Sequence, residues 1–228
     1  LMASEPKAAF PAIFAERLKM KGVIAVLVID DPEKAVPVAR ILIEAGIDAM
    51  ELALRTPSSL ESLGRIVEEV PEMLAGVGTV LRAEQVWEAK EKGASFIVTP
   101  GTNRAVIEAA LQHGMPIAPG IAVPSDIETA LEYGCRILKI FPAESLGGLP
   151  YLRAINAPYA HLGIRYIPLG GVSEVNCGSY LAEPAVLAVG GSWIAPREAI
   201  QKGNWDAIRA SAVRAAGACN REGKPCLR

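Results

Sequence analysis

Apolar segments of strand length alternate with amphipathic helical segments along almost the whole chain. The first apolar segment covers residues 22–29, and Asp31 followed by Pro32 then marks a helix start, with a capping side chain and a proline in the first turn. The later expected strands are residues 49–54, 74–80, 96–99, 116–121, 137–141, 165–169 and 186–189. A helix is expected after each strand, and a short amphipathic helix over residues 11–21 precedes the first one.

About eight strand–helix units therefore follow one another, and no segment between them is typical of a linker. Strands that alternate with helices imply parallel pairing through right-handed crossovers, and eight such units close naturally into a barrel. We therefore expect an α/β fold, a (β/α)₈ TIM barrel with a short extra N-terminal helix, as one domain over residues 1–228. Residues 1–9 are expected to be disordered or an expression remnant. A doubly wound open sheet is the alternative fold.

Residues 137–144, with the sequence ILKIFPAE, contain the most informative strand of the chain. In a strand, Leu138 and Ile140 face one side, and Ile137, Lys139 and Phe141 face the other. A strand that is apolar on both faces is usually buried on both faces, so Lys139 is expected to point into a closed interior. Burial favours the neutral amine, which is a nucleophile able to form a Schiff base with a carbonyl substrate. In the alternative interpretation, Lys139 reaches water at a strand end or pairs with a carboxylate.

The second strand also carries charge on its inner face. Met50, Leu52 and Leu54 alternate with Glu51, Ala53 and Arg55, and the apolar set is expected to pack on the helices. This orientation sends Glu51 and Arg55 inward. A buried Glu51–Arg55 ion pair with a purely structural role is one interpretation. Since an apolar pair would often serve stability as well, two charges on a core face favour a functional role.

The last two expected strands each end in a Gly-Gly pair, in the segments PLGGVS and VGGSW. Glycine lets backbone N–H groups approach an anion closely, and Ser192 adds a hydroxyl donor. Barrel active sites lie at the C-terminal ends of the strands, and a phosphate site commonly lies after the last two. His113 and His161 are expected to be structural or surface residues, because neither lies at these strand ends.

Composition excludes several classes of protein. The formal net charge is −2 with no basic run, which gives no electrostatic support for binding nucleic acid or an anionic membrane. No apolar run is long enough to span a membrane, and the first ten residues do not resemble a secretory signal. The four cysteines are widely spaced, so reduced thiols in a cytoplasmic protein without a metal or other cofactor are expected.

Six segments together resemble, in order, those of the 2-keto-3-deoxy-6-phosphogluconate (KDPG) aldolase and 4-hydroxy-2-oxoglutarate (KHG) aldolase family. They are MELALRTP, GVGTVL, TPG, LKIFPAE, GGVS and GGSW, and the resemblance covers about residues 22–205. It implies a class I, metal-independent aldolase on a small (β/α)₈ barrel. Such a lyase cleaves KDPG to pyruvate and glyceraldehyde 3-phosphate and is usually a homotrimer.

The resemblance also implies residue roles. Lys139 matches the Schiff-base lysine and Glu51 the general acid/base. The other implied roles are carboxylate binding by Arg55 and Thr79, pocket walls from Pro100 and Phe141, and phosphate binding by Gly170, Gly171, Gly191 and Ser192. KDPG-cleaving members typically carry threonine before the first Gly-Gly pair, where this chain has Leu169, which is expected to face the substrate.

Other functions remain open from the sequence. The galactonate-derived epimer of KDPG is an alternative substrate, because leucine at position 169 cannot donate a hydrogen bond to a substrate hydroxyl. A phosphosugar isomerase or synthase barrel would share the Gly-Gly pairs but needs no lysine on the sixth strand. A non-catalytic barrel that binds phosphate ligands or serves as an oligomer scaffold predicts that Lys139 is unreactive.

Overall fold

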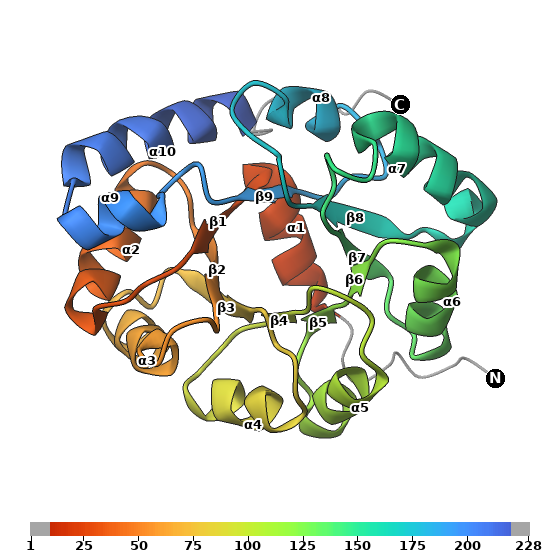
Figure 1. Cartoon of the computed structure of the whole chain (residues 1–228), viewed down its shortest axis with the longest axis horizontal. Helices are drawn as coiled ribbons and strands as arrows, with labels where there is room; N and C mark the ends of the chain where they lie inside the picture. Colours follow the sequence, from red (N-terminus) through yellow and green to blue (C-terminus); the bar gives the residue numbers. More distant parts are fainter. Residues whose placement is uncertain (1–9, 220–228) are drawn as a thin grey trace.

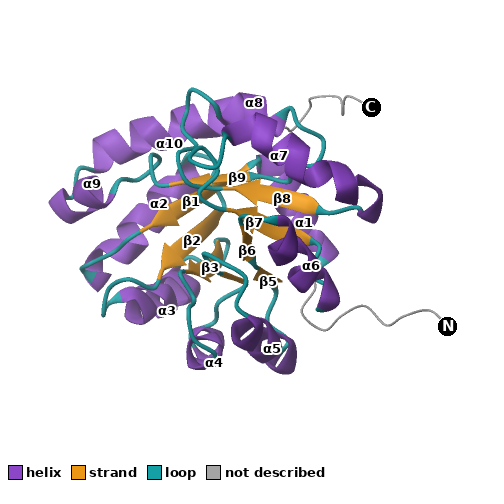
Figure 2. Cartoon of the chain, turned by 45° about the vertical axis from the view of Figure 1, so that its right-hand side comes forward, coloured by secondary structure: helices purple, strands orange, loops and turns teal. Residues whose placement is uncertain are grey.

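Parallel strands form the centre of the fold, and helices surround them (Figures 1 and 2). The structure, a computed structural model, describes residues 10–219, so the expectation for residues 1–9 lies outside the described residues. The strands are β1 (Val23–Leu27), β2 (Ala49–Ala53), β3 (Leu74–Gly78), β4 (Ile97–Val98), β5 (Ile117–Ala118), β6 (Gly120–Ile121), β7 (Ile137–Ile140), β8 (Arg165–Pro168) and β9 (Val189–Gly191). The α-helices are α1 (Ala12–Lys21), α2 (Ala35–Glu44), α3 (Ser59–Glu69), α4 (Glu84–Glu91), α5 (Arg104–His113), α6 (Pro124–Glu132), α7 (Gly148–Asn156), α8 (Cys177–Leu181), α9 (Arg197–Lys202) and α10 (Trp205–Cys219). Two 3₁₀ helices, η1 (Pro32–Lys34) and η2 (Ala157–Leu162), complete the described elements.

The strands form two sheets, and every strand pair in them is parallel. The larger sheet has the order β5-β4-β3-β2-β1-β9, and the smaller has the order β6-β7-β8. Strands β5 and β6 belong to one expected strand that is interrupted at Pro119, since proline cannot donate a ladder hydrogen bond. At the other edge, Tyr166 of β8 forms a single parallel bridge with Val186, just before β9. The smaller sheet thus adjoins both edges of the curled larger one, and the last strand lies beside the first, unlike the strand order of a doubly wound sheet.

Side chains of the strands divide between two apolar clusters. Outward residues such as Leu52, Leu138 and Tyr166 pack with the helices in the larger cluster. Inward residues such as Ile24 and Phe96 form a smaller cluster inside the curled sheets. This alternation is the one expected for strands that are buried on both faces.

Helix α1 covers the end of the curled sheets at which the strands begin (Figure 1). Leu18 is completely buried in the inner cluster, and Phe14 packs against the same cluster. The Arg17 guanidinium donates hydrogen bonds to the Asp48 carboxylate at 2.8 Å and to the Asp48 carbonyl at 3.1 Å, just before β2. One end of the interior is therefore closed by the chain itself.

Most expected elements are present, and the differences have local causes. Helix α9 was not expected, because six residues give too short a pattern to detect. Strand β9 lies at Val189–Gly191 rather than 186–189, because Gly190 and Gly191 carry no side chains that could show the alternation. No helix within residues 10–219 is long and apolar enough to cross a membrane.

Candidate active site

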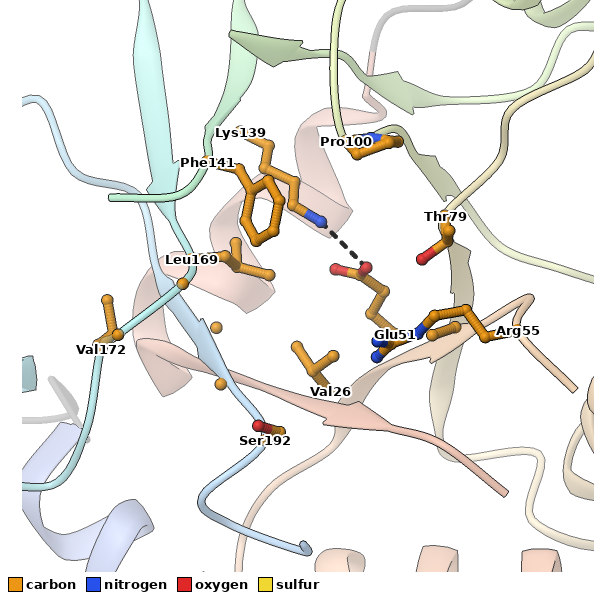
Figure 3. Close-up of a pocket in the computed structure, with 15 residues that line it drawn as sticks. Val26, Glu51, Arg55, Thr79, Pro100, Lys139, Phe141, Leu169, Val172 and Ser192 are labelled. Atoms are coloured by element: carbon orange, nitrogen blue, oxygen red, sulfur yellow. Dashed lines mark hydrogen bonds and ion pairs between the residues drawn. The ribbon is translucent and has the colours of Figure 1, made fainter. Parts of the chain in front are cut away.

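A cavity opens where the strands end, and every residue that the sequence analysis assigned to the site lines it (Figure 3). Its lining residues are Val26, Glu51, Ala53, Arg55, Thr79, Pro100, Lys139, Phe141, Leu169, Gly170, Gly171, Val172, Gly190, Gly191 and Ser192. Sequence reasoning missed Val26 and Val172 as lining residues, because a valine in or after an apolar strand carries no chemical signal. The cavity lies at the C-terminal strand ends, where the sequence analysis expected the site, and the role of each residue stays a prediction.

Lys139 lies at the base of this cavity, on the inner face of β7. Its neighbours Leu138 and Ile140 pack outward in the larger apolar cluster, as the alternation of the strand predicts. Only 5% of the lysine is exposed. Its ammonium nitrogen donates a hydrogen bond to Glu51 Oε1 at 3.2 Å, and it lies 5.1 Å from the centre of the Phe141 ring. A carboxylate and an aromatic face therefore both contact the amine within a nearly dry environment.

Glu51 enters the cavity from β2 and is 3% exposed. Its partner is Lys139 on the far side of the interior, so the Glu51–Arg55 pair considered in the sequence analysis is not formed. Arg55 lines the cavity nearer the solvent, as an exposed residue. Its guanidinium makes no hydrogen bond or ion pair with any residue between positions 10 and 219, which leaves its donors available to an anion.

Thr79 follows β3 directly and has an unusual backbone. Its φ of 58° is the only positive value at a non-glycine residue in the described part of the chain. A β-branched residue is rarely found in this left-handed region, and such strain is concentrated at functional sites. The Thr79 hydroxyl has no hydrogen-bond partner among residues 10–219. Pro100 lines the cavity after β4.

The ends of β8 and β9 place two glycine pairs at the rim. Gly170 and Gly171 both have a φ of 87°, which residues other than glycine rarely adopt. The Asn176 side chain holds the loop after them by accepting a hydrogen bond from Ser173 N at 2.8 Å and donating one to the Gly171 carbonyl at 3.3 Å. Within residues 10–219, the backbone N–H groups of Gly170, Gly171 and Ser192 donate to no protein acceptor. These donors can bind an oxyanion.

Glu144 ends the segment ILKIFPAE, close to the strand ends, but does not line the cavity. Its carboxylate accepts a hydrogen bond from the Tyr180 hydroxyl of α8. Burial, together with this hydrogen bond, raises the pKa of Tyr180 well above its usual range, so that the phenol remains a donor. This pair connects the segment after β7 to α8.

The cavity thus separates two kinds of chemistry by depth. An amine and a carboxylate meet at its nearly dry base, while a guanidinium and free N–H groups lie at its wetter rim. Such a site can form a covalent bond with a carbonyl group at the base and hold anionic groups closer to solvent. Within residues 10–219, no three His, Cys, Asp or Glu side chains are grouped so that they could hold a metal ion.

Comparison with known proteins agrees with this geometry. Residues 14–211 match the family model described as KDPG and KHG aldolase. The chain is 43% identical over 195 residues to 2-dehydro-3-deoxy-phosphogluconate aldolase of Treponema pallidum (86% of this chain, 92% of the relative) and 38% identical over 195 residues to KHG/KDPG aldolase of Escherichia coli K12 (85% and 91%). A crystal structure of KDPG aldolase from Legionella pneumophila, with pyruvate captured as a covalent carbinolamine intermediate, superposes with a TM-score of 0.83 at 35% identity, over 88% of this chain and 97% of the other. The chain therefore belongs to the KDPG and KHG aldolase family.

Proposed function

We propose that this protein is a class I aldolase, a carbon–carbon lyase that cleaves KDPG to pyruvate and glyceraldehyde 3-phosphate. KHG is the second substrate that we propose for it. The observation that carries the proposal is the Lys139 amine, buried at the base of the cavity and 3.2 Å from the Glu51 carboxylate. The names of the relatives and the covalent pyruvate in the Legionella enzyme support it.

In this proposal Lys139 forms the covalent intermediate. The unprotonated amine attacks the 2-keto carbon, and loss of water from the carbinolamine gives an iminium ion. Glu51 takes the proton from the hydroxyl on carbon 4 as the bond between carbons 3 and 4 breaks. The electron pair of that bond passes to the iminium nitrogen and leaves an enamine of pyruvate. Protonation of the enamine at carbon 3 and hydrolysis then release pyruvate and restore the lysine.

The remaining cavity residues bind and orient the substrate. Arg55 and Thr79 bind the carboxylate beside the keto group, and the Arg55 fork can hold it with two parallel hydrogen bonds. Pro100 and Phe141 form walls around the pyruvyl methyl group. Gly170, Gly171, Gly191 and Ser192 bind the phosphate, and the free N–H groups at the rim support this assignment.

Leu169 favours a second candidate substrate. It is buried on the inner face, where its side chain packs against Gly190, and it lines the cavity. An apolar wall discriminates weakly between hydroxyl configurations, whereas a hydrogen-bonding residue discriminates strongly. We therefore include the galactonate-derived epimer as an alternative substrate. The Lys139–Glu51 pair is the observation that disfavours an isomerase or a non-catalytic barrel, because neither needs it.

We further propose that the two sheets form one eight-stranded barrel, with β5 and β6 as two halves of a single strand and α1 as the extra N-terminal helix. The Tyr166–Val186 bridge supports closure at the other edge. We also propose that the protein acts as a cytoplasmic homotrimer. The family resemblance supports the trimer, and the buried thiols of Cys135 and Cys177, which form no disulfide, fit a reducing compartment. Sedimentation equilibrium tests the trimer directly.

Borohydride reduction in the presence of pyruvate, followed by peptide mass spectrometry, tests the proposed chemistry. A stable pyruvyl adduct is expected on Lys139, and the Lys139→Ala variant is expected to lack it. Lys90→Ala serves as the matched control, because Lys90 is an exposed lysine that hydrogen-bonds the His113 carbonyl, and it should keep the adduct. An adduct on another lysine, or none at all, would contradict the aldolase assignment.

A further inference from the structure

Strand β3 carries glycine at two inward positions, Gly76 and Gly78, beside the strand that carries Glu51. The register pairs Glu51 with Gly76 and Ala53 with Gly78. An ideal Cβ atom built on Gly78 would lie 1.7 Å from Glu51 Oε1, 2.4 Å from its Cδ and 2.6 Å from its Cγ. The Glu51 side chain therefore leans diagonally along β3, and its carboxylate occupies the space that a side chain at position 78 would fill.

The oxygen involved is the one that contacts the lysine. Glu51 Oε1 accepts the hydrogen bond from Lys139 Nζ at 3.2 Å, and the same oxygen is closest to the Cβ position of Gly78. Gly78 lies within a regular strand and is not among the glycines with positive φ. Its backbone would therefore accept an alanine, and what glycine provides here is the space above the strand.

We propose that Gly78 is a positioning residue for Glu51. The space left free above Gly78, which we call the seat, holds the carboxylate so that Oε1 points at Lys139. This inference rests on the proposed role of Glu51 as the proton-transfer group. A methyl group at position 78 cannot share the seat, because heavy atoms do not approach to 1.7 Å. The carboxylate must then move away from Lys139, while the lysine itself, on β7, keeps its place.

The test separates proton transfer from covalent binding. In Gly78→Ala, the end-point yield of the borohydride-trapped pyruvate adduct on Lys139 is expected to stay near that of the parent. Exchange of the pyruvate methyl protons with deuterium oxide, followed by NMR, is expected to slow by about 10²-fold, as for loss of an acid/base group. A general loss of folding would lower both readouts together.

A double-variant cycle shows whether the effect acts through Glu51. In a Glu51→Ala background no carboxylate occupies the seat, so adding Gly78→Ala is expected to change exchange by less than about twofold. Gly76→Ala is the matched control on the same face of β3, because its Cβ atom would lie 2.4 Å from the Phe96 ring instead. The loss of melting temperature caused by Gly76→Ala should persist when Glu51 is replaced by alanine, whereas the loss caused by Gly78→Ala should disappear.

The outcomes distinguish this inference from the role of Glu51. If Glu51→Ala alone exchanges at the parent rate, the proton-transfer role of Glu51 is wrong, and the melting-temperature cycle still decides whether Gly78 seats the carboxylate. If the Gly78→Ala variant does not fold, the inference requires the double variant Glu51→Ala/Gly78→Ala to fold. Parent-like exchange in Gly78→Ala, an undiminished melting-temperature loss in the Glu51→Ala background, or a double variant that fails to fold would each overturn the inference.

Discussion

Lys139 and Glu51 form an ion pair that is almost completely removed from water. Two charges in such a place cost desolvation energy, which their mutual attraction offsets only when the geometry is good. Removing one partner leaves the other uncompensated, so truncation to alanine perturbs both stability and chemistry. For turnover measurements at Glu51, a substitution that keeps volume and polarity therefore separates the chemical effect from the loss of stability.

We predict that Glu51→Gln slows KDPG cleavage by about 10²-fold or more, since an amide cannot accept the proton that the carboxylate accepts. Formation of the borohydride-trapped pyruvate adduct should remain partly intact. Steady-state kinetics and adduct mass spectrometry measure the two effects. Glu61→Gln, at a surface carboxylate paired with Arg65, is the control and should cleave at the parent rate. Near-normal turnover in Glu51→Gln would mean that Glu51 only balances the lysine charge.

Ser192 is exposed at the rim, and its hydroxyl has no protein partner within residues 10–219. We predict that Ser192→Ala raises KM for phosphorylated KDPG, because one donor to the phosphate is lost. Cleavage of unphosphorylated KHG should remain nearly unchanged. Parallel kinetics on the two substrates measure this difference. Equal losses on both substrates would show that Ser192 does not act through the phosphate.

Leu169 gives the third residue-scale prediction. With leucine, both carbon-4 epimers should be cleaved. Leu169→Thr should increase the preference for the gluconate-derived substrate by ~1–2 kcal/mol, if one hydrogen bond to the substrate hydroxyl is restored. The measurement is kcat/KM for both epimers. Ile167→Val, two residues earlier on the same inner face, should leave the preference unchanged. A strong gluconate preference in the parent enzyme would contradict this account.

At the scale of elements, the sequence predicts the helices and strands that show a clear pattern of apolar side chains. It misses features that depend on the backbone alone. Helix α5 (Arg104–His113) is predictable from the sequence, because its apolar spacing and its terminal Gly114 are both clear. The interruption at Pro119 and the shift of β9 onto two glycines were missed, because neither changes the apolar pattern. Among the residues that line the cavity, the charged residues and the glycines could be predicted from the sequence, whereas Val26 and Val172 could not. The partner of Glu51 could not be predicted, because a pair across the interior of the curled sheets depends on tertiary structure.

Asn103 gives a prediction at the scale of elements. Its side-chain oxygen caps α5 by accepting from Ala105 N at 3.1 Å, and its amide donates to the Leu81 carbonyl at 3.1 Å, which joins the loops after β3 and β4. Asn103→Ala should lower the free energy of unfolding by about 1–2 kcal/mol. Asn103→Asp keeps the capping oxygen and should lose less. Urea denaturation measures the free energy of unfolding of both variants. Equal losses in the two variants would show that the cap contributes little.

At the scale of the whole molecule, α1 connects stability to the closed end of the interior. Leu18→Ala should lower the free energy of unfolding by about 2–5 kcal/mol, because it leaves a cavity in the inner cluster. Below the unfolding transition, KDPG cleavage should stay near the parent rate, since the reacting groups lie toward the other end. Ile13→Ala, on the same helix at a residue that is 74% exposed, is the control and should change stability little. A large loss of kcat in folded Leu18→Ala would show that α1 also shapes the site.

Because α1 covers the end at which the strands begin, the route to Lys139 within residues 10–219 runs from the rim at which the strands end. In the proposed function, pyruvate is bonded to Lys139 at the bottom of that route, and the phosphate of the aldehyde is bound at the rim. In the proposed reaction the aldehyde departs before pyruvate, because pyruvate stays bonded to Lys139 until hydrolysis, and in the reverse, condensing direction pyruvate must enter first. An excess of aldehyde phosphate at the rim would then obstruct the path of pyruvate to the lysine, so the closed end of the fold reinforces the order that the covalent chemistry of Lys139 sets.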